Sequence, residues 1–315
     1  MRRFPEPDQT PDGPAYQGRL LADPDEEIVD QGVRFDLGTL MTRRGILGLG
    51  VLGLGTVALA ACAPLATGTT ATPTSTPSAD PTGASGSPTV AGEIPEETAG
   101  PYPGDGSNGP DVLEMSGIVR SDIRSSIDGG ATADGVPLAF TFTLLDLVNG
   151  TPFAGAAVYA WHCDAEGGYS MYSSGLEDVT YLRGVQVADA GGQVTFTSVF
   201  PGCYSGRWPH IHFEVYPDVA SITDSTAAIA TSQLAFPQDV CDAVYADSRY
   251  PGSARNLAQI GSLANDNIFS DDSQGLQTAV LAGSASAGYT ATLAVGIDTS
   301  TAAGGGGMAP GGGPR

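Results

Sequence analysis

The sequence predicts an all-β protein, an antiparallel β-sandwich with few short helices. Apolar and polar residues alternate with a period of two in the middle of the chain, as in residues 138–144, where every second residue is Leu or Phe. Further short runs of this kind follow at regular spacing, separated by Gly- and Pro-containing turns, which is typical of a sandwich. Helical periodicity is scarce, and its best example is the short segment 238–246.

The other strands are expected in a simple order along the chain. Residues 158–161 are apolar, and residues 185–187 and 193–197 flank an Asp-Ala-Gly-Gly sequence, which predicts a β-hairpin. Residues 210–215 alternate again, with apolar residues at 211, 213 and 215. A last pair, near 276–282 and 288–297, flanks a Gly/Ser turn.

The sandwich is expected to occupy residues 93–300 of the 315. Residues 1–40 are polar, acidic and without a sustained period, which indicates a disordered or untranslated extension. Residues 63–92 are almost entirely Ala, Thr, Pro, Ser and Gly, and they predict a flexible linker. Residues 301–315 are glycine-rich, and they predict a disordered tail.

Residues 41–62 combine the features of an export signal. The pair Arg43-Arg44 precedes an apolar run that is shorter than the roughly 20 residues of a membrane-spanning helix, which is the twin-arginine pattern. The run ends in Leu-Ala-Ala-Cys, which resembles a bacterial lipobox with Cys62 as the lipidated residue. The alternative is a buried helix that holds a cysteine, but three signals coincide in the right order. Either Met1 or Met41 fits as the start of translation.

We therefore expect an exported protein on the outer face of the bacterial cytoplasmic membrane, attached only through a lipid at Cys62. The formal net charge is −22, and none of the 13 basic residues is lysine. A surface this acidic repels phosphate backbones and anionic headgroups, which excludes nucleic-acid binding and attachment to membranes by charge.

The first candidate site is the sequence His210-Ile211-His212, which contains two of the three histidines of the chain. On a strand, residues i and i+2 point to the same face, so both imidazoles project together while Ile211 points into the core. Two adjacent imidazoles can bind one metal ion. By itself the pattern is weak, because two surface histidines on an exposed strand would look the same.

Two tyrosines lie in loops beside predicted strands. Tyr204 belongs to a Gly- and Pro-containing segment that leads into the His210-Ile211-His212 strand, and Tyr169 ends a glycine-containing loop after the strand at 158–161. Either tyrosine alone would ordinarily be a packed aromatic residue.

Together these residues resemble a known family. The sequence contains Trp-His-x-Asp-x-x-Gly-x-Tyr-Ser at 161–170, Leu-Arg-Gly-x-Gln at 182–186 and Pro-Gly-x-Tyr-x-Gly-Arg-x-x-His-Ile-His at 201–212. In this order the three blocks are similar to the intradiol ring-cleavage dioxygenases, and the segment 97–102 also resembles that family. The similarity extends over about 93–300 and implies the core fold of that family.

The resemblance implies a non-haem Fe(III) centre that inserts O₂ into catechol-type rings and gives cis,cis-muconate products. The four ligands that it implies are Tyr169, Tyr204, His210 and His212. It also implies that substrate displaces Tyr204, and that Arg207 and Gln233 are the active-site arginine and glutamine. A trivalent cation favours phenolate over phenol, and hard oxygen ligands suit ferric iron.

Two other functions fit part of the sequence. One is an exported, non-enzymatic β-sandwich of the carrier type, which would be expected to lack some of the four ligands. The other is a copper- or zinc-binding protein that uses His210 and His212, which leaves both tyrosines and Arg207 without a role. The oligomeric state and the particular catechol stay open.

Three cysteines follow Cys62, and an exported protein can oxidise them. The pairing among Cys163, Cys203 and Cys241 stays open, with Cys203–Cys241 as the favoured bond.

Overall fold

The computed structural model describes residues 8–10, 13–16, 19–20 and 90–301. The predicted export signal and most of the predicted linker and tail therefore lie outside the described residues. Near the N-terminus, three short strands form an antiparallel sheet in the order β1 (Asp8–Thr10), β2 (Gly13–Tyr16) and β3 (Arg19–Leu20). These strands lie within residues 1–40, for which the sequence predicts a disordered or untranslated extension, because such short strands leave no hydrophobic period in the sequence.

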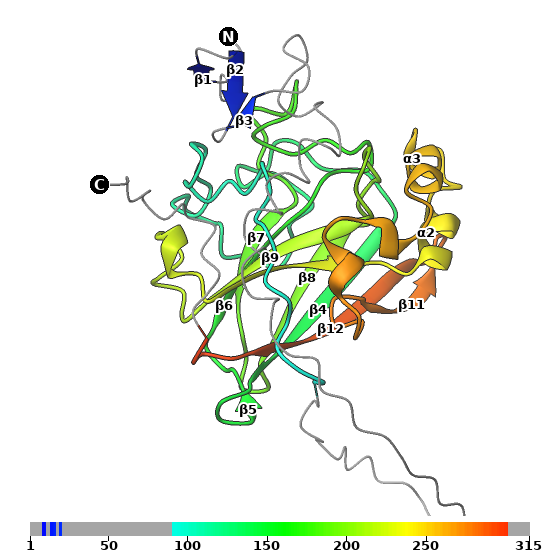
Figure 1. Ribbon diagram of the computed structural model, residues 1–315. Coiled ribbons are helices and arrows are strands. Elements are labelled where there is room, and N and C mark those ends of the chain that lie inside the picture. Colours follow the sequence, from blue (N-terminus) through cyan, green and yellow to red (C-terminus); the bar gives the residue numbers. More distant parts are fainter. Residues whose placement is uncertain (1–7, 11–12, 17–18, 21–89, 302–315) are drawn as a thin grey trace, which may run out of the picture.

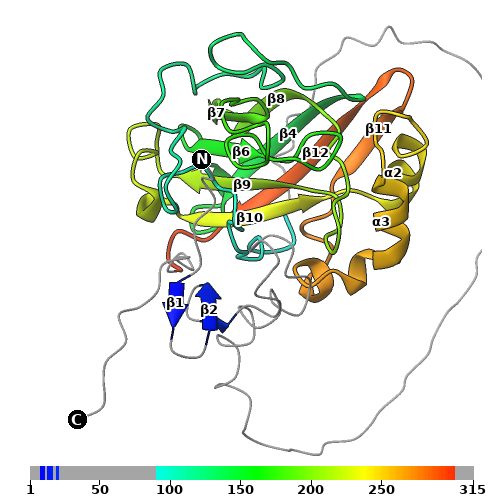
Figure 2. The ribbon, with the colours of Figure 1, turned by 90° about the horizontal axis from the view of Figure 1, so that it is seen from above.

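Two sheets stack to form the main domain, as Figures 1 and 2 show. The first sheet is antiparallel throughout, and its strand order is β10 (Ala230–Ala235), β9 (His210–Tyr216), β6 (Ala157–Trp161) and β7 (Arg183–Val187). The second sheet contains β11 (Val280–Ser284), β12 (Gly288–Ile297), β4 (Pro137–Asp146), β5 (Thr151–Pro152) and β8 (Gln193–Val199). The predicted β-sandwich is confirmed, with one difference: β12 and β4 pair in parallel.

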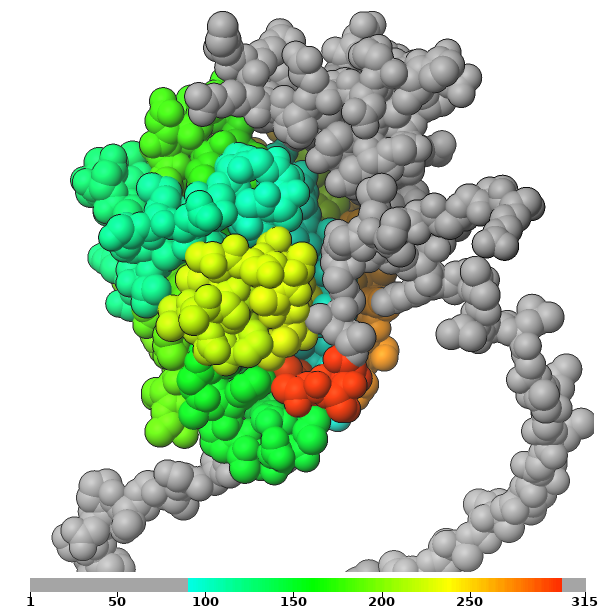
Figure 3. Space-filling model, turned by 90° about the vertical axis from the view of Figure 1, so that its left-hand side faces the viewer, coloured from blue at the N-terminus to red at the C-terminus, as the bar shows by residue number. Residues whose placement is uncertain are grey.

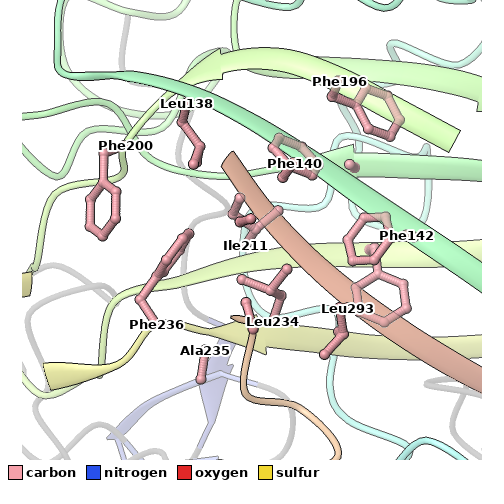
Figure 4. Close-up of a cluster of buried hydrophobic side chains, with 14 of the residues drawn as sticks. Leu138, Phe140, Phe142, Phe196, Phe200, Ile211, Leu234, Ala235, Phe236 and Leu293 are labelled. Carbon is pink, nitrogen blue, oxygen red and sulfur yellow. The ribbon is translucent and has the colours of Figure 1, made fainter. Parts of the chain in front are cut away.

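The core lies between the sheets and consists of the residues that alternate along the strands. Phe140 and Phe142 of β4 meet Ile211 of β9 and Leu293 of β12 there, as Figure 4 shows. The rings of Phe142 and Phe213 are 4.5 Å apart between centroids. Burial of each such side chain is worth about 1.5–3 kcal/mol, so the alternation in sequence determines which strand face turns inward.

The predicted hairpin between 185–187 and 193–197 is wrong, although its turn exists. Asp189 accepts hydrogen bonds from the backbone N–H groups of Gly191 and Gln193, which closes the turn. However, β7 pairs with β6 and β8 pairs with β4, so the chain passes from one sheet to the other at this point. The later predicted pair is confirmed as the antiparallel hairpin β11–β12.

The helices α2 (Gln238–Val244) and α3 (Ser253–Ile260) are short and lie beside β11 at one end of the sandwich, as Figures 1 and 2 show. The predicted helix appears as α2. A second helix, α3, was not predicted, since Leu257 is its only buried large apolar residue. The described residues also contain three short 3₁₀ helices: η2 (Ser225–Ala227), η3 (Leu263–Asn265) and η4 (Phe269–Asp271). None of the helices in the described residues is long and apolar enough to span a membrane.

Loops cover the outer face of the first sheet. Every residue of β9 is buried, although only Ile211, Phe213 and Val215 face the core between the sheets. In Figure 3 the cyan segment that begins the domain and the yellow segment after β9 lie side by side on this surface. The outer face of β9 is therefore enclosed by the protein, and this enclosure contains the candidate site.

Candidate metal centre

β9 presents His210 and His212 on the face opposite the core. Their Nε2 atoms are 3.1 Å apart, and each residue is only 2% exposed. The ring of His212 stacks on that of Trp161, with an interplanar angle of 6°. The predicted common face is confirmed, but the two histidines are buried rather than exposed on the surface.

Two loops bring the predicted tyrosines to these histidines. The Oη atom of Tyr204 lies 3.1 Å from His210 Nε2, and that of Tyr169 lies 3.5 Å from the same nitrogen. Glycines allow the two loops to pack closely. A Cβ at Gly202 would lie 2.7 Å from the Ala165 carbonyl oxygen. The glycines of the sequence blocks therefore bring both tyrosines to one point.

His210 Nε2 has more polar neighbours than one hydrogen bond can satisfy. The Nδ1 atom of the same ring is 2.5 Å from the carbonyl oxygen of Trp208, and this acceptor requires the proton on Nδ1. Nε2 then carries a lone pair, and it lies 3.1–3.5 Å from the Oη atoms of Tyr169 and Tyr204 and from Nε2 of His212. Donors that each lie about 2 Å from a shared metal ion have similar mutual spacings. The four side chains therefore fit a metal ion.

The charge states of the histidines also fit a metal ion. Burial, together with the charge of Arg207, lowers the pKa of His210 to about 3. Burial and the neighbouring His210 hold the pKa of His212 well below its usual value. Both imidazoles are thus neutral at physiological pH, which is the state that binds metals.

The tyrosines need a cation to ionise. Burial raises the pKa of both Tyr169 and Tyr204 well above 10, so both are phenols in the absence of a metal. A bound trivalent cation would reverse this preference. In the described part of the chain, no three His, Cys, Asp or Glu side chains gather into a metal site, so the tyrosines are essential to this one.

Arg207 and Gln233 lie at the same site, as predicted. Gln233 is the partner of His212 in the β10–β9 register, and its Oε1 accepts a hydrogen bond of 2.7 Å from Arg207 Nη2. The amide nitrogen of Gln233 donates to the carbonyl oxygen of Thr98 at 3.0 Å. Six predicted residues, from two loops and from the strands β9 and β10, therefore meet.

Asp266 is a site residue that sequence reasoning missed. Its fully buried carboxylate accepts hydrogen bonds from Arg207 Nε at 3.0 Å and from the backbone N–H of Trp208 at 2.6 Å. Burial alone would raise the pKa of Asp266, but the charge of Arg207 and these donors outweigh it and lower that pKa. Asp266 lies 59 positions after Arg207, in a segment without a motif, so no signal pointed to it.

Arg183 was also missed, although the Leu-Arg-Gly block contains it. It is completely buried and its five N–H groups are all used. They donate to Ser170 Oγ and O, to the Tyr159 hydroxyl, and to the carbonyl oxygens of Tyr102 and Pro103. Arg183 thus connects the loop of Tyr169 to the segment that begins the domain.

That initial segment covers the site. The ring of Tyr102 packs on that of Tyr169 at 4.8 Å between centroids. Gly100 has a φ of +73°, and a Cβ there would lie 3.2 Å from His212 Cε1. The segment 98–104, which we name the strap, therefore lies directly over the candidate ligands.

The remaining histidine and the cysteines do not belong to this centre. Both ring nitrogens of His162 have partners, Cys163 O and Ser198 Oγ, each at 2.7 Å. The three cysteines of the described residues, Cys163, Cys203 and Cys241, are free and buried. The favoured Cys203–Cys241 disulfide is therefore wrong. Each thiol instead faces a backbone carbonyl, that of Arg207 for Cys203 and that of Phe236 for Cys241.

Comparisons with known proteins find relatives of this chain among dioxygenases. A family model described as "Dioxygenase" matches residues 108–243. A chlorocatechol 1,2-dioxygenase of Rhodococcus opacus is 31% identical over 107 residues, which is 28% of this chain and 41% of that protein. A catechol 1,2-dioxygenase 1 of Acinetobacter lwoffii is 30% identical over 127 residues, 34% of this chain and 40% of that protein. The chain thus matches about two fifths of the length of these relatives.

A solved structure agrees in fold. An intradiol ring-cleavage dioxygenase from Tetranychus urticae covers 68% of this chain and 98% of its own, with 24% identity and a TM-score of 0.50. The family match includes Tyr169, Tyr204, His210, His212 and Gln233. In sequence and in fold, the chain is therefore similar to the intradiol ring-cleavage dioxygenases.

Proposed function

We propose that this protein is a non-haem Fe(III) dioxygenase that cleaves catechol-type rings between the two hydroxyl-bearing carbons. The observation that carries the proposal is the convergence of Tyr169, Tyr204 and His212 on His210 Nε2 within 3.5 Å. In the overall reaction, one catechol and one O₂ give one cis,cis-muconic acid, and both oxygen atoms enter the product. The proposed ligands are the four side chains of this cluster.

A bound ferric ion would keep the phenols ionised, bind a catechol through both oxygens and accept electron density from it. The two tyrosines differ in how firmly the surrounding protein holds their side chains. Tyr169 is 2% exposed, its ring is covered by Tyr102, and its backbone N–H donates to Ser173 Oγ at 2.8 Å. Tyr204 is partly exposed and lies in an irregular loop. Tyr204 is therefore the ligand that we expect to leave, and its Oη would take up a proton from a substrate hydroxyl.

Arg207 and Gln233 would bind and orient the substrate. Of the three guanidinium nitrogens of Arg207, only Nη1 has no hydrogen-bond partner among the described residues. A fixed donor next to the reacting ring can stabilise negative charge that develops on an oxygen in the transition state. The hydrogen bond to Gln233 and the ion pair with Asp266 hold this donor in place.

The metal assignment is tested on purified protein made with iron available. Iron is expected at about one per chain, with a red-brown tyrosinate-to-iron absorption band. His212→Ala should lose most of the iron, and Tyr169→Phe should change the band. Tyr289→Phe is the matched control, because Tyr289 is a buried tyrosine of the other sheet whose hydroxyl makes no hydrogen bond with the described residues. Zinc or copper in place of iron would support the alternative of a copper- or zinc-binding protein.

The reaction is tested by identifying the product. Catechol and O₂ should give cis,cis-muconate, detected by ultraviolet absorbance and mass spectrometry. Cleavage beside the two hydroxyls is typical of ferrous sites with two histidines and a carboxylate, and it would give a yellow semialdehyde. A semialdehyde, or no oxygen uptake with any catechol by iron-loaded protein, would contradict the proposal.

We also propose that the enzyme is exported and anchored on the outer face of the cytoplasmic membrane by a lipid at Cys62. The support is the order of the twin arginines, the apolar run and the lipobox-like sequence, all outside the described residues. Metabolic labelling with a fatty acid should mark the wild type and not Cys62→Ala. Equal labelling of both would refute the anchor.

A further inference from the structure

We propose that Asp266 neutralises Arg207 and thereby makes the site select uncharged catechols over catechols that carry a carboxylate. This inference rests on the proposed function and specifies its substrate class. Arg207 is the only arginine in the described residues that has a free N–H group at the site. Whether its positive charge is neutralised by a neighbouring carboxylate therefore decides how strongly an anionic substituent of the substrate binds.

Both members of the Arg207–Asp266 ion pair are held in place by other contacts. Asp266 is fully buried, and its Oδ1 also accepts from the backbone N–H groups of Ile268 and Phe269 at 2.8 and 3.2 Å. The guanidinium of Arg207 is only 12% exposed and lies over the ring of Phe269 at 5.9 Å. A pair in such surroundings is weakly screened by water and cannot separate easily. Arg207 thus offers a hydrogen bond without a net positive charge.

Among the described residues, Arg183 cannot serve as a second cation for a substrate carboxylate at this site. Arg183 is completely buried, and its five donors are already bonded to protein oxygens. Two of these oxygens are backbone carbonyls of the strap and of the Tyr169 loop, and these two segments enclose the Arg183 side chain. A carboxylate that enters the site would therefore lose water without gaining a counter-charge, which is unfavourable.

The charge of the whole domain acts in the same direction. Residues 90–301 contain 25 acidic residues and six arginines, a formal charge of −19. Such a field lowers the local concentration of anions and slows their association, whereas neutral catechols are unaffected. The ion pair and the domain charge therefore both disfavour anionic substrates.

A pair of substrates with nearly equal shape tests this. 3,4-Dihydroxybenzamide and 3,4-dihydroxybenzoate differ mainly in charge. We expect the amide to bind about tenfold or more tightly, as measured by anaerobic titration of the iron-loaded protein, and to show a similar advantage in kcat/KM. The difference should shrink as NaCl is raised from 10 to 300 mM. Equal binding of the two at low salt would overturn the inference.

Variants separate charge compensation from structural damage. Asp266→Asn should leave Arg207 uncompensated and reduce the amide-to-benzoate ratio by about tenfold, even if activity falls. Asp242→Asn removes an exposed carboxylate of α2 and should leave the ratio unchanged. A loss of activity on both substrates with an unchanged ratio would show that Asp266 is only structural. If Asp266→Asn does not fold, the salt dependence of the wild type decides the question.

The outcome also separates this inference from the proposed function. Cleavage of catechol to muconate together with equal use of the benzoate would retain the function and reject the selectivity. If no catechol is cleaved but the amide still binds more tightly than the benzoate, the binding selectivity stands and the enzymatic proposal fails.

Discussion

Several polar side chains near the site are buried, and for the carboxyl group of Glu214 this burial should make the stability of the fold depend on pH. Glu214 lies on the same face of β9 as His210 and His212 and is 3% exposed. It accepts a hydrogen bond from Tyr216, but no cation among the described residues pairs with it. Burial, with a smaller contribution from Asp105, raises the pKa of Glu214 to about 8. The folded protein therefore holds a proton on Glu214 that the unfolded chain releases near pH 4.5.

The first prediction concerns Glu214→Gln. Between pH 4.5 and 8 the folded state binds more protons at this position, so stability falls as pH rises. The amide cannot ionise, and the variant should therefore be more stable than the wild type by up to a few kcal/mol at pH 8, and similar to it near pH 4.5. Urea unfolding of metal-free protein at both pH values is the measurement. Glu114→Gln, at an exposed position, should show no such trend.

The second prediction concerns Gly100, where backbone and contact effects can be separated. Gly100→Ala should destabilise by about 1 kcal/mol because of its positive φ, and the Cβ would in addition press on His212 at 3.2 Å. Gly150 has a similar φ of +65° and nothing within 4 Å of its virtual Cβ. Gly150→Ala should therefore show the backbone cost alone.

Iron retention during dialysis against a chelator distinguishes the two glycine variants. Gly100→Ala should lose iron faster than Gly150→Ala. Equal iron loss would mean that the strap does not contact the ligands closely enough to matter.

The residues that could be predicted from sequence are those whose spacing has a geometric meaning. The i, i+2 spacing placed His210 and His212 on one face, whereas Tyr169 and Tyr204 were assigned through the resemblance of their glycine-containing blocks to the dioxygenase family. Asp266 could not be predicted, because a buried carboxylate that approaches from a distant loop leaves no local pattern.

At the scale of elements, alternation predicted the strands but not their partners. The Asp-Ala-Gly-Gly turn forms as expected, and yet β7 and β8 belong to different sheets. A turn sequence specifies the local backbone, whereas the sheet that a strand joins depends on distant apolar faces. The parallel pairing of β12 with β4 could not be predicted for the same reason, since the sequence of a strand does not determine whether its partner runs parallel or antiparallel to it.

Arg183 provides the element-scale prediction, because it connects β7, the strap and the Tyr169 loop. Arg183→Met should remove five hydrogen bonds and leave buried carbonyl oxygens unpaired, at a cost of about 3 kcal/mol or more. Arg124→Met breaks an exposed ion pair with Asp122 and should cost about 0–1 kcal/mol.

Denaturant unfolding of metal-free protein compares the two arginine variants. Limited proteolysis adds a local measurement, since release of the strap should expose new cleavage sites near residues 98–104 in Arg183→Met only. A cost as small as that of Arg124→Met would mean that the buried network is not needed to hold these segments together.

At the scale of the whole molecule, the most informative property is charge. The domain carries a formal charge of −19 over residues 90–301, and five of its six arginines make ion pairs or hydrogen bonds through their side chains. Repulsion between carboxylates of one sign opposes the compact state, because unfolding moves them apart. This term acts over distances of about 10 Å, so it depends on added salt.

The last prediction follows from that repulsion. Raising NaCl from 10 to 150 mM should increase the unfolding temperature by a few degrees, since the screening length falls from about 30 Å to about 8 Å in this range. Hydrophobic burial changes little at these concentrations, and so the shift isolates electrostatics. A variant with three exposed carboxylates neutralised, at Glu114, Asp128 and Asp242, should have a higher unfolding temperature at low salt and a smaller salt response. An unfolding temperature that is independent of salt would mean that carboxylate repulsion is too weak to influence this fold.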